Sequence, residues 1–198
     1  ELYMSIADYA DSRERHYQAG VLARENDELA DACAIFGEDI EYGDSVEALY
    51  QTGIIASKAQ NYAVSVAAFT AAGEYKDAAM KCSMDTYAWG SQLYDDGDYD
   101  KSAEVFASMG DFSDAPTRAN EARYAAAGVA MSNGAYDDAA TRYTALGNFR
   151  DSADKANVAA YAAADEQLEA GDYIAAKARF ANLDSYSDSK AKTQECDY

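Results

Sequence analysis

The sequence predicts an all-α protein built from helix-turn-helix repeats of 33–37 residues. Three observations support this fold class. A phrase of aromatic, small and acidic residues recurs six times along the chain, and its spacing changes once, by about one helical turn. The composition also favours helix, because alanine fills long stretches and Pro116 is the only proline.

The recurring phrase begins with an aromatic residue and has a small or apolar residue four positions later. A second aromatic follows two positions further on, and an aspartate two positions after that. Its clearest copies are Phe69-Gly73-Tyr75-Asp77, Phe106-Gly110-Phe112-Asp114 and Tyr143-Gly147-Phe149-Asp151. With the fainter copies, the aspartates of the phrase are Asp11, Asp44, Asp77, Asp114, Asp151 and Asp188. Their spacings of 33, 33, 37, 37 and 37 residues indicate successive structural repeats.

A row of tyrosines keeps step with these aspartates and shows where the repeat length changes. The row consists of Tyr17, Tyr50, Tyr87, Tyr124, Tyr161 and Tyr198. The distance from each aspartate to the next tyrosine is 6, 6, 10, 10, 10 and 10 residues. Four residues are about one turn of α-helix. We therefore expect the first helix of the later repeats to be one turn longer at its start.

Each repeat is predicted to hold a helix A, a glycine turn, a helix B and a connection to the next repeat. In the fifth repeat, helix A is expected over about residues 151–169 and helix B over about 172–183. The motif aspartate stands where an N-cap accepts hydrogen bonds from free backbone NH groups. The glycines that follow helix B are expected at φ > 0: Gly73, Gly110 and Gly147. The aromatic of helix B, such as Phe106 or Phe180, is predicted to be buried.

These markers divide residues 1–198 into one continuous segment of repeats. The expected repeats are residues 11–43, 44–76, 77–113, 114–150 and 151–187, with partial repeats at 1–10 and 188–198. The first partial repeat is predicted to be part of a helix B and the last part of a helix A. We expect the chain to be a piece of a longer protein, because neither end carries a polar capping repeat.

The sequence resembles the tetratricopeptide repeat (TPR) family. Gly171-Tyr173-Ala176-Phe180 is similar to the second half of the TPR motif. The small position of the first TPR helix is matched by Gly20, Gly53, Gly90, Ala127 and Ala164. The resemblance implies a right-handed αα superhelix whose A helices line a concave surface. The chain departs from the family in its 37-residue repeats and in the Gly-x-aromatic-x-Asp connection, a variant of the kind seen in bacterial repeat proteins.

The net charge of −20 excludes several classes of partner. Nucleic acids and anionic membrane surfaces would repel the chain. No apolar run approaches the length needed to span a bilayer, so no membrane insertion by this segment is expected. A neutral or basic protein segment and a neutral glycan remain compatible with the charge, which also keeps an elongated protein soluble.

Catalytic and metal-binding motifs find little support. His16 is the only histidine and has no nucleophile motif near it in sequence. Asp96, Asp98 and Asp100 have the spacing of the first calcium ligands of an EF-hand, but Lys101 and Ala107 stand where glycine and glutamate belong. The three cysteines have no zinc-ligand spacing. No catalytic residue, metal or cofactor is therefore predicted.

Two rows of residues were considered as binding surfaces. The basic row is Lys81, Arg118, Lys155 and Lys192, each four residues after its aspartate, where a local helical ion pair is expected. It lies about 120° around the helix from the tyrosines, so the two rows are predicted to occupy different faces. The candidate ligand-binding residues are Tyr50, Tyr87, Tyr124 and Tyr161, because tyrosine combines apolar area with a hydroxyl. The alternative is that these tyrosines pack between repeats.

The sequence favours a non-enzymatic scaffold that binds a protein or an extended peptide. The alternatives are a spacer or stalk, or a glycan-binding segment of a larger bacterial surface protein. Its location is expected to be either cytoplasmic or the extracytoplasmic part of a membrane-anchored protein, and the sequence does not predict an oligomeric state.

Overall fold

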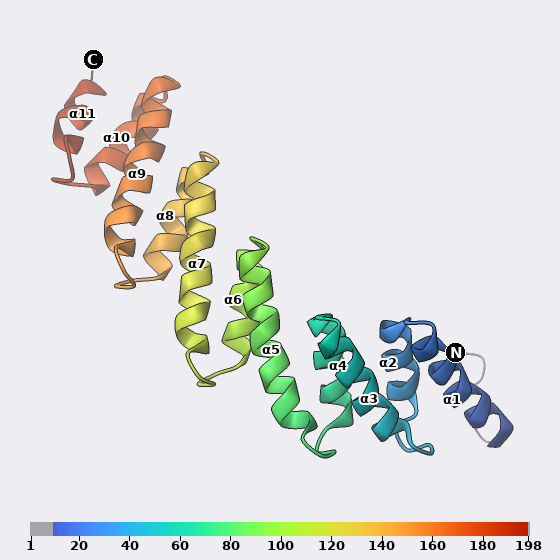
Figure 1. Ribbon diagram of the computed structural model, residues 1–198. Helices are drawn as coiled ribbons and strands as arrows, with labels where there is room; N and C mark the ends of the chain where they lie inside the picture. The colour runs from blue at the N-terminus through green and yellow to red at the C-terminus, as the bar shows by residue number, and fades with distance from the viewer. Residues whose placement is uncertain (1–9, 198) are drawn as a thin grey trace. The chain divides into compact units, whose positions relative to one another are not determined.

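The computed structural model describes residues 10–197, which form eleven α-helices and no strand (Figure 1). The expected helix over residues 1–7 lies outside the described residues. The helices are α1 Ala10–Glu25, α2 Leu29–Glu38, α3 Ser45–Lys58, α4 Tyr62–Ala72, α5 Ala78–Asp95, α6 Tyr99–Ser108, α7 Ala115–Ser132, α8 Tyr136–Ala145, α9 Ser152–Glu169, α10 Tyr173–Asn182 and α11 Ser189–Glu195. The odd-numbered helices are the predicted A helices, and the even-numbered helices are the B helices.

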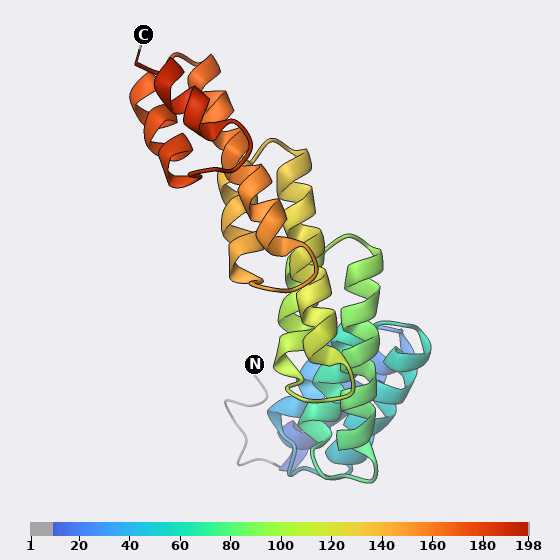
Figure 2. The same ribbon diagram turned by 90° about the vertical axis from the view of Figure 1, so that its left-hand side faces the viewer.

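This arrangement confirms the all-α class and the helix-turn-helix repeat. Within the first unit, consecutive helices from α1 to α5 pack against one another, and within the second unit those from α8 to α11 do the same (Figures 1 and 2). The insertion is confirmed as well, since α3 has 14 residues whereas α5, α7 and α9 have 18. Each of these helices ends eight residues after its tyrosine, so the additional turn lies at the start.

The described residues cluster in two compact units. The first contains residues 10–96 and 108–115, and the second contains residues 97–107 and 116–197. One division therefore falls between helices A and B of the third repeat, not at the end of a repeat. Within residues 10–197, no helix combines the length and apolar character needed to cross a bilayer.

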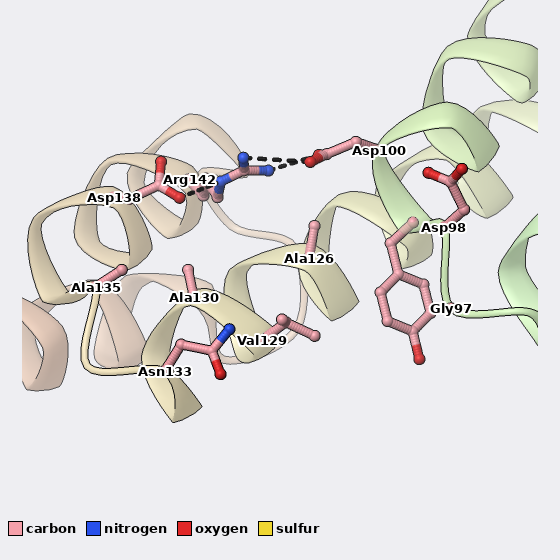
Figure 3. Close-up of a pocket in the computed structure, with 11 residues that line it drawn as sticks. Gly97, Asp98, Asp100, Ala126, Val129, Ala130, Asn133, Ala135, Asp138 and Arg142 are labelled. Atoms are coloured by element: carbon pink, nitrogen blue, oxygen red, sulfur yellow. Dashed lines mark hydrogen bonds and ion pairs between the residues drawn. The ribbon is translucent and has the colours of Figure 1, made fainter.

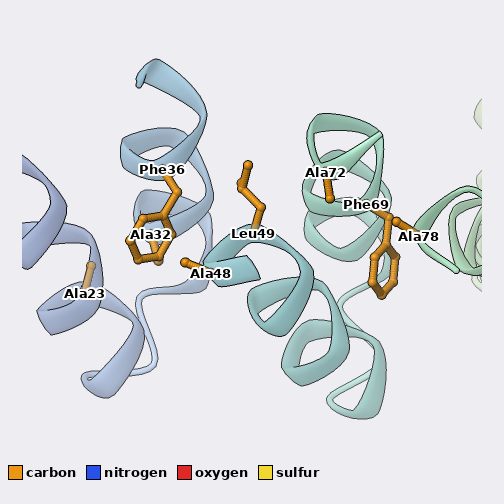
Figure 4. Packing of buried hydrophobic residues seen from close by; sticks show 8 residues of the cluster. All are labelled: Ala23, Ala32, Phe36, Ala48, Leu49, Phe69, Ala72 and Ala78. Carbon is orange, nitrogen blue, oxygen red and sulfur yellow. The ribbon is translucent and has the colours of Figure 1, made fainter. Parts of the chain in front are cut away.

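Each unit has a core built from alanines and one large aromatic per B helix. In the first unit, Phe36 of α2 and Phe69 of α4 are 1 % exposed and pack with Leu49 and the surrounding alanines (Figure 4). In the second unit, Tyr143 of α8 and Phe180 of α10 take the same place. The predicted burial of the helix B aromatic is thus confirmed, and alanine allows the helices to approach closely.

The small residues that the TPR-like pattern predicted in the A helices are buried. They are Gly20, Gly53, Gly90, Ala127 and Ala164. A Cβ atom on Gly53 would lie 2.7 Å from the ring of Phe69, so glycine is required there at the observed helix spacing. The glycines after helix B have positive φ as expected, with values of 61° at Gly73 and 57° at Gly110 and Gly147.

One buried position departs from the repeat pattern. Asp85 of α5 is 9 % exposed, and the corresponding residue of α3, α7 and α9 is an alanine that is 3 % exposed or less. One carboxylate oxygen accepts a hydrogen bond from the Ser57 hydroxyl at 3.1 Å, and the other oxygen has no partner. Burying an unpaired polar atom lowers stability.

We therefore expect Asp85→Ala to raise the free energy of unfolding by about 1–2 kcal/mol in urea denaturation. The reciprocal change, Ala122→Asp at the same position of α7, should lower it, because the other repeats are built around alanine there. If Asp85→Ala destabilised the protein, Asp85 would have a stabilising partner and this interpretation would be wrong.

Candidate functional site

The four tyrosines predicted as a ligand-binding row lie at junctions between successive repeats. Each hydroxyl donates a hydrogen bond to the aspartate that begins the next repeat: Tyr50 to Asp77 at 2.6 Å, Tyr87 to Asp114 at 2.6 Å, Tyr124 to Asp151 at 2.5 Å, and Tyr161 to Asp188. The rings also contact aromatic residues, so that Tyr124 lies 5.5 Å from Tyr143 and 6.2 Å from Phe149, between ring centroids. The tyrosines thus couple neighbouring repeats, and their binding of a ligand stays a prediction.

The motif aspartates differ from the expectation in one respect. They occupy the N-cap position, since α3, α5, α9 and α11 each begin at the next residue. Their side chains, however, make no capping hydrogen bond with the helix, so that part of the prediction was wrong. The carboxylates of Asp77 and Asp151 instead accept the tyrosine hydroxyl, which holds the pKa of both below the usual range.

A glutamate strengthens the junction between α3 and α5. Glu47 accepts hydrogen bonds from the Lys76 ammonium at 2.6 Å and from the Tyr75 hydroxyl. These donors, with the Lys76 ammonium contributing most, lower the pKa of Glu47 from 4.5 to about 2. A carboxyl whose pKa is lower in the folded than in the unfolded state stabilises the fold at pH values above its unfolded pKa. This stabilisation is lost as the pH falls through the folded pKa.

We expect the wild-type Tm to fall between about pH 4.5 and 2 more steeply than that of Glu47→Gln, because the variant lacks the titrating group. Thermal unfolding followed by circular dichroism checks this. Glu74→Gln, a change at an exposed residue of the same connection, is the control and should retain the wild-type slope. A Glu47→Gln profile parallel to the wild type would contradict the stabilising role of Glu47.

The basic row meets the tyrosine row of the preceding repeat, a contact that the prediction of different faces on one helix did not include. Lys81 makes the expected local ion pair with Asp77 at 3.4 Å. The ammonium of Lys155, however, lies 5.1 Å from the ring centroid of Tyr124, and that of Lys192 lies 5.4 Å from Tyr161. The predicted angle of about 120° relates residues of one helix, whereas these contacts join the A helices of adjacent repeats. The lysines thus reinforce the junctions.

The residues considered for catalysis or calcium binding have other neighbours. His16 is 6 % exposed, and its Nε2 atom lies 3.2 Å from a carboxylate oxygen of Glu38. Asp98 pairs with Lys101 at 2.8 Å, and Asp100 pairs with Arg142.

A surface groove in the second unit is the strongest candidate binding site. Two hollows, of about 290 and 460 Å³, are lined by α6, α7 and α8 and share Asp100 and Arg142. Figure 3 shows the residues that line the smaller one. The Arg142 guanidinium bridges from α8 to Asp100 of α6, with N–O distances of 2.6 and 3.3 Å, and its Nε donates to Asp138 at 2.8 Å. We call this surface the α7 groove.

One stripe of α7 forms the floor of this groove. Its residues are Arg123, Ala126 and Ala130, which share one face of the helix, and Asn133 follows directly after the end of α7. The alanines leave the hollow open because their side chains are short. The exposed carboxamide of Asn133 can both donate and accept a hydrogen bond, as a peptide group requires of its partner.

A second groove occurs 37 residues later in the same unit. It has a volume of about 290 Å³ and is lined by Ala140, Thr144, Ala156, Asn157, Ala160, Arg179, Asn182 and Leu183, from α8, α9 and α10. Arg179 forms a two-pronged ion pair with Asp137 of α8, which repeats the pair between Arg142 and Asp100. We call this surface the α9 groove. Alanines and an ion pair between B helices are therefore common to both grooves, whereas their carboxamides stand at different positions of the repeat.

The sequence contained a signal for these grooves. At the positions of Ala126 and Ala130, the A helix of the third repeat has Trp89 and Leu93, so side-chain volume falls in α7. Likewise, Asp100 and Arg142 recur as Asp137 and Arg179 at the same interval. The loss of side-chain volume in α7 is not visible when repeats are compared only for the motifs they share. The recurring aspartate–arginine pair is not visible when ion pairs are sought only within one helix.

Neither a known protein family nor a curated protein sequence matches this chain in the comparisons.

Proposed function

We propose that this chain is a non-enzymatic, TPR-like interaction scaffold that binds an extended segment of another protein. The observation that carries the proposal is the recurrence of one hollow in consecutive repeats, namely the 460 Å³ hollow of the α7 groove and the α9 groove. A row of equivalent sites suits a ligand that is itself extended, because each repeat adds contacts of the same kind. The TPR-like repeat pattern supports the same class of function.

The chemistry of the grooves favours a peptide over a charged small molecule. Asn133, Asn157 and Asn182 are exposed and can pair with main-chain NH and CO groups. The alanine floors accept side chains of moderate size. The charge of −20 favours a neutral or basic segment. In this proposal the four tyrosines hold the repeats together, and the ligand lies in the grooves.

The proposal is tested with peptides selected from a random displayed library against the 198-residue chain. The decisive variant is Ala130→Gln, which fills the floor of the α7 groove with the residue that Gln167 provides in α9. The matched control is Ala79→Gln, the same change at an exposed site of α5. Calorimetry should show binding at least about tenfold weaker for Ala130→Gln and unchanged for the control.

Two results would count against the scaffold. Failure to select any peptide would favour the spacer or stalk, in which the segment has no ligand. Selected peptides that bind Ala130→Gln and the wild type equally well would place the binding surface outside the α7 groove.

A further inference from the structure

The first unit exposes an apolar surface that the proposed function does not use. Met80 and Met84 of α5 are 58 % and 57 % exposed, and Phe112, in the connection after α6, is 39 % exposed. We call these three residues the methionine patch. Soluble proteins expose single apolar side chains freely, but a cluster of large ones marks an interaction surface.

The patch is continuous across its two segments of chain. Met80, Met84 and Tyr87 follow at i, i+4 and i+7, which places them on one face of α5. The Tyr87 ring lies 6.4 Å from that of Phe112, between centroids. Beside Phe112 there is a hollow of about 270 Å³, which Met109 also lines.

Comparison with equivalent repeats shows what is unusual about this junction. The residue three positions before the tyrosine is Glu47 in α3 and Glu121 in α7, and it pairs with a basic residue just before the next motif aspartate, at 2.6 and 3.0 Å. Here the two positions hold Met84 and Ser113. A methionine and a serine thus stand where an ion pair covers the junctions at Tyr50 and Tyr124. The junction at Tyr161 lacks this pair as well, but Lys192 pairs there with Asp165.

We propose that the methionine patch is a second docking surface, for an apolar segment of another protein that is flanked by basic residues. Methionine suits this task because its unbranched, polarisable side chain adapts to different apolar partners. A second copy of the chain is disfavoured, since each copy carries a charge of −20. The same charge attracts a basic partner, and the exposed Asp111 lies directly beside Phe112 in the sequence.

The probe is a defined amphipathic peptide of leucine and lysine, about 18 residues long, which forms five helical turns with one apolar face. A peptide of the same composition in scrambled order controls for charge alone. Binding to the full chain is measured by fluorescence anisotropy at about 0.15 M salt, where unspecific attraction is screened. The amphipathic peptide should bind at least about tenfold more tightly than the scrambled one.

Met84→Glu is the decisive variant, because the neighbouring repeats have glutamate at this position and the fold accepts it. It adds negative charge, so attraction by charge alone would strengthen, whereas loss of the apolar contact weakens binding. We expect the Kd of the amphipathic peptide to rise about tenfold. Gln92→Glu adds the same charge at an exposed site of α5 outside the patch, and it should not weaken binding. Met80→Gln, a neutral change, should weaken binding independently.

Equal or tighter binding by Met84→Glu, equal binding of the scrambled peptide, or no binding of the amphipathic peptide would each overturn the proposal. The proposal would also be overturned by light scattering that shows a molar mass rising with protein concentration in the wild type and the monomer value in Met84→Glu. That result would assign the patch to self-association. None of these outcomes depends on the α7 groove, which is tested by Ala130→Gln.

Discussion

Phe180→Ala is expected to lower the free energy of unfolding by about 3–5 kcal/mol. Phe180 is fully buried and packs in one cluster with Ala164 and Ala176, and its ring centroid lies 5.5 Å from that of Tyr161. Its buried neighbours Ala164 and Ala176 are too small to fill the cavity that the substitution leaves. Urea denaturation followed by circular dichroism measures the change.

Ile174→Ala is the matched control, because this residue of the same helix is 86 % exposed. Its stability should remain within about 0.5 kcal/mol of the wild type. Asp151→Ala, which removes the acceptor of the Tyr124 hydroxyl at the surface, should have a much smaller effect than Phe180→Ala. If the aspartate change were the more damaging, the assignment of the core to the helix B aromatics would be wrong.

Gly53→Ala should also destabilise the protein, by about 3 kcal/mol. The added methyl group would lie 2.7–2.9 Å from three atoms of the Phe69 ring, which is 1 % exposed and has no free space to move into. Helix propensity opposes this effect, since alanine is better than glycine in a helix interior by about 1 kcal/mol. Steric overlap is expected to dominate, because both helices must separate to relieve it.

Gly37→Ala, in α2, controls for propensity alone, because nothing lies within 4 Å of a Cβ atom built there. It should leave stability unchanged or raise it slightly. Thermal unfolding of the two variants side by side makes the comparison. A Gly53→Ala protein as stable as Gly37→Ala would show that α3 and α4 do not approach as closely as described.

The helices and their lengths could be predicted because they depend on local signals. Recurring aspartates marked the helix starts, glycines marked the turns, and the four-residue change showed the additional turn in α5. The burial of Phe106 and Phe180 followed from helical periodicity. Each of these features belongs to a single repeat, so comparing the sequence of one repeat with that of the next is enough to find them.

Contacts between repeats were harder to predict. Only the distance from each aspartate to the next tyrosine was used, to locate the insertion. The constant distance of 27 residues from each tyrosine to the next motif aspartate marks the hydrogen bond from Tyr124 to Asp151. The contact of Lys155 with Tyr124 was missed because it crosses to another helix. The grooves and the methionine patch depend on differences between repeats, such as Ala130 against Leu93 or Met84 against Glu47.

All of these proposals depend on contacts that run between neighbouring repeats in a fixed register. Deletion of one whole repeat, residues 114–150, tests that claim most directly. It joins Ser113 to Asp151 and leaves Tyr87 at the same 27-residue distance from a motif aspartate. Circular dichroism should show the helical content per residue of the wild type and cooperative unfolding. The control deletion of residues 114–147, which leaves three additional residues and breaks the register, should be much less stable. An unfolded in-register deletion, or equal behaviour of the two, would contradict the account.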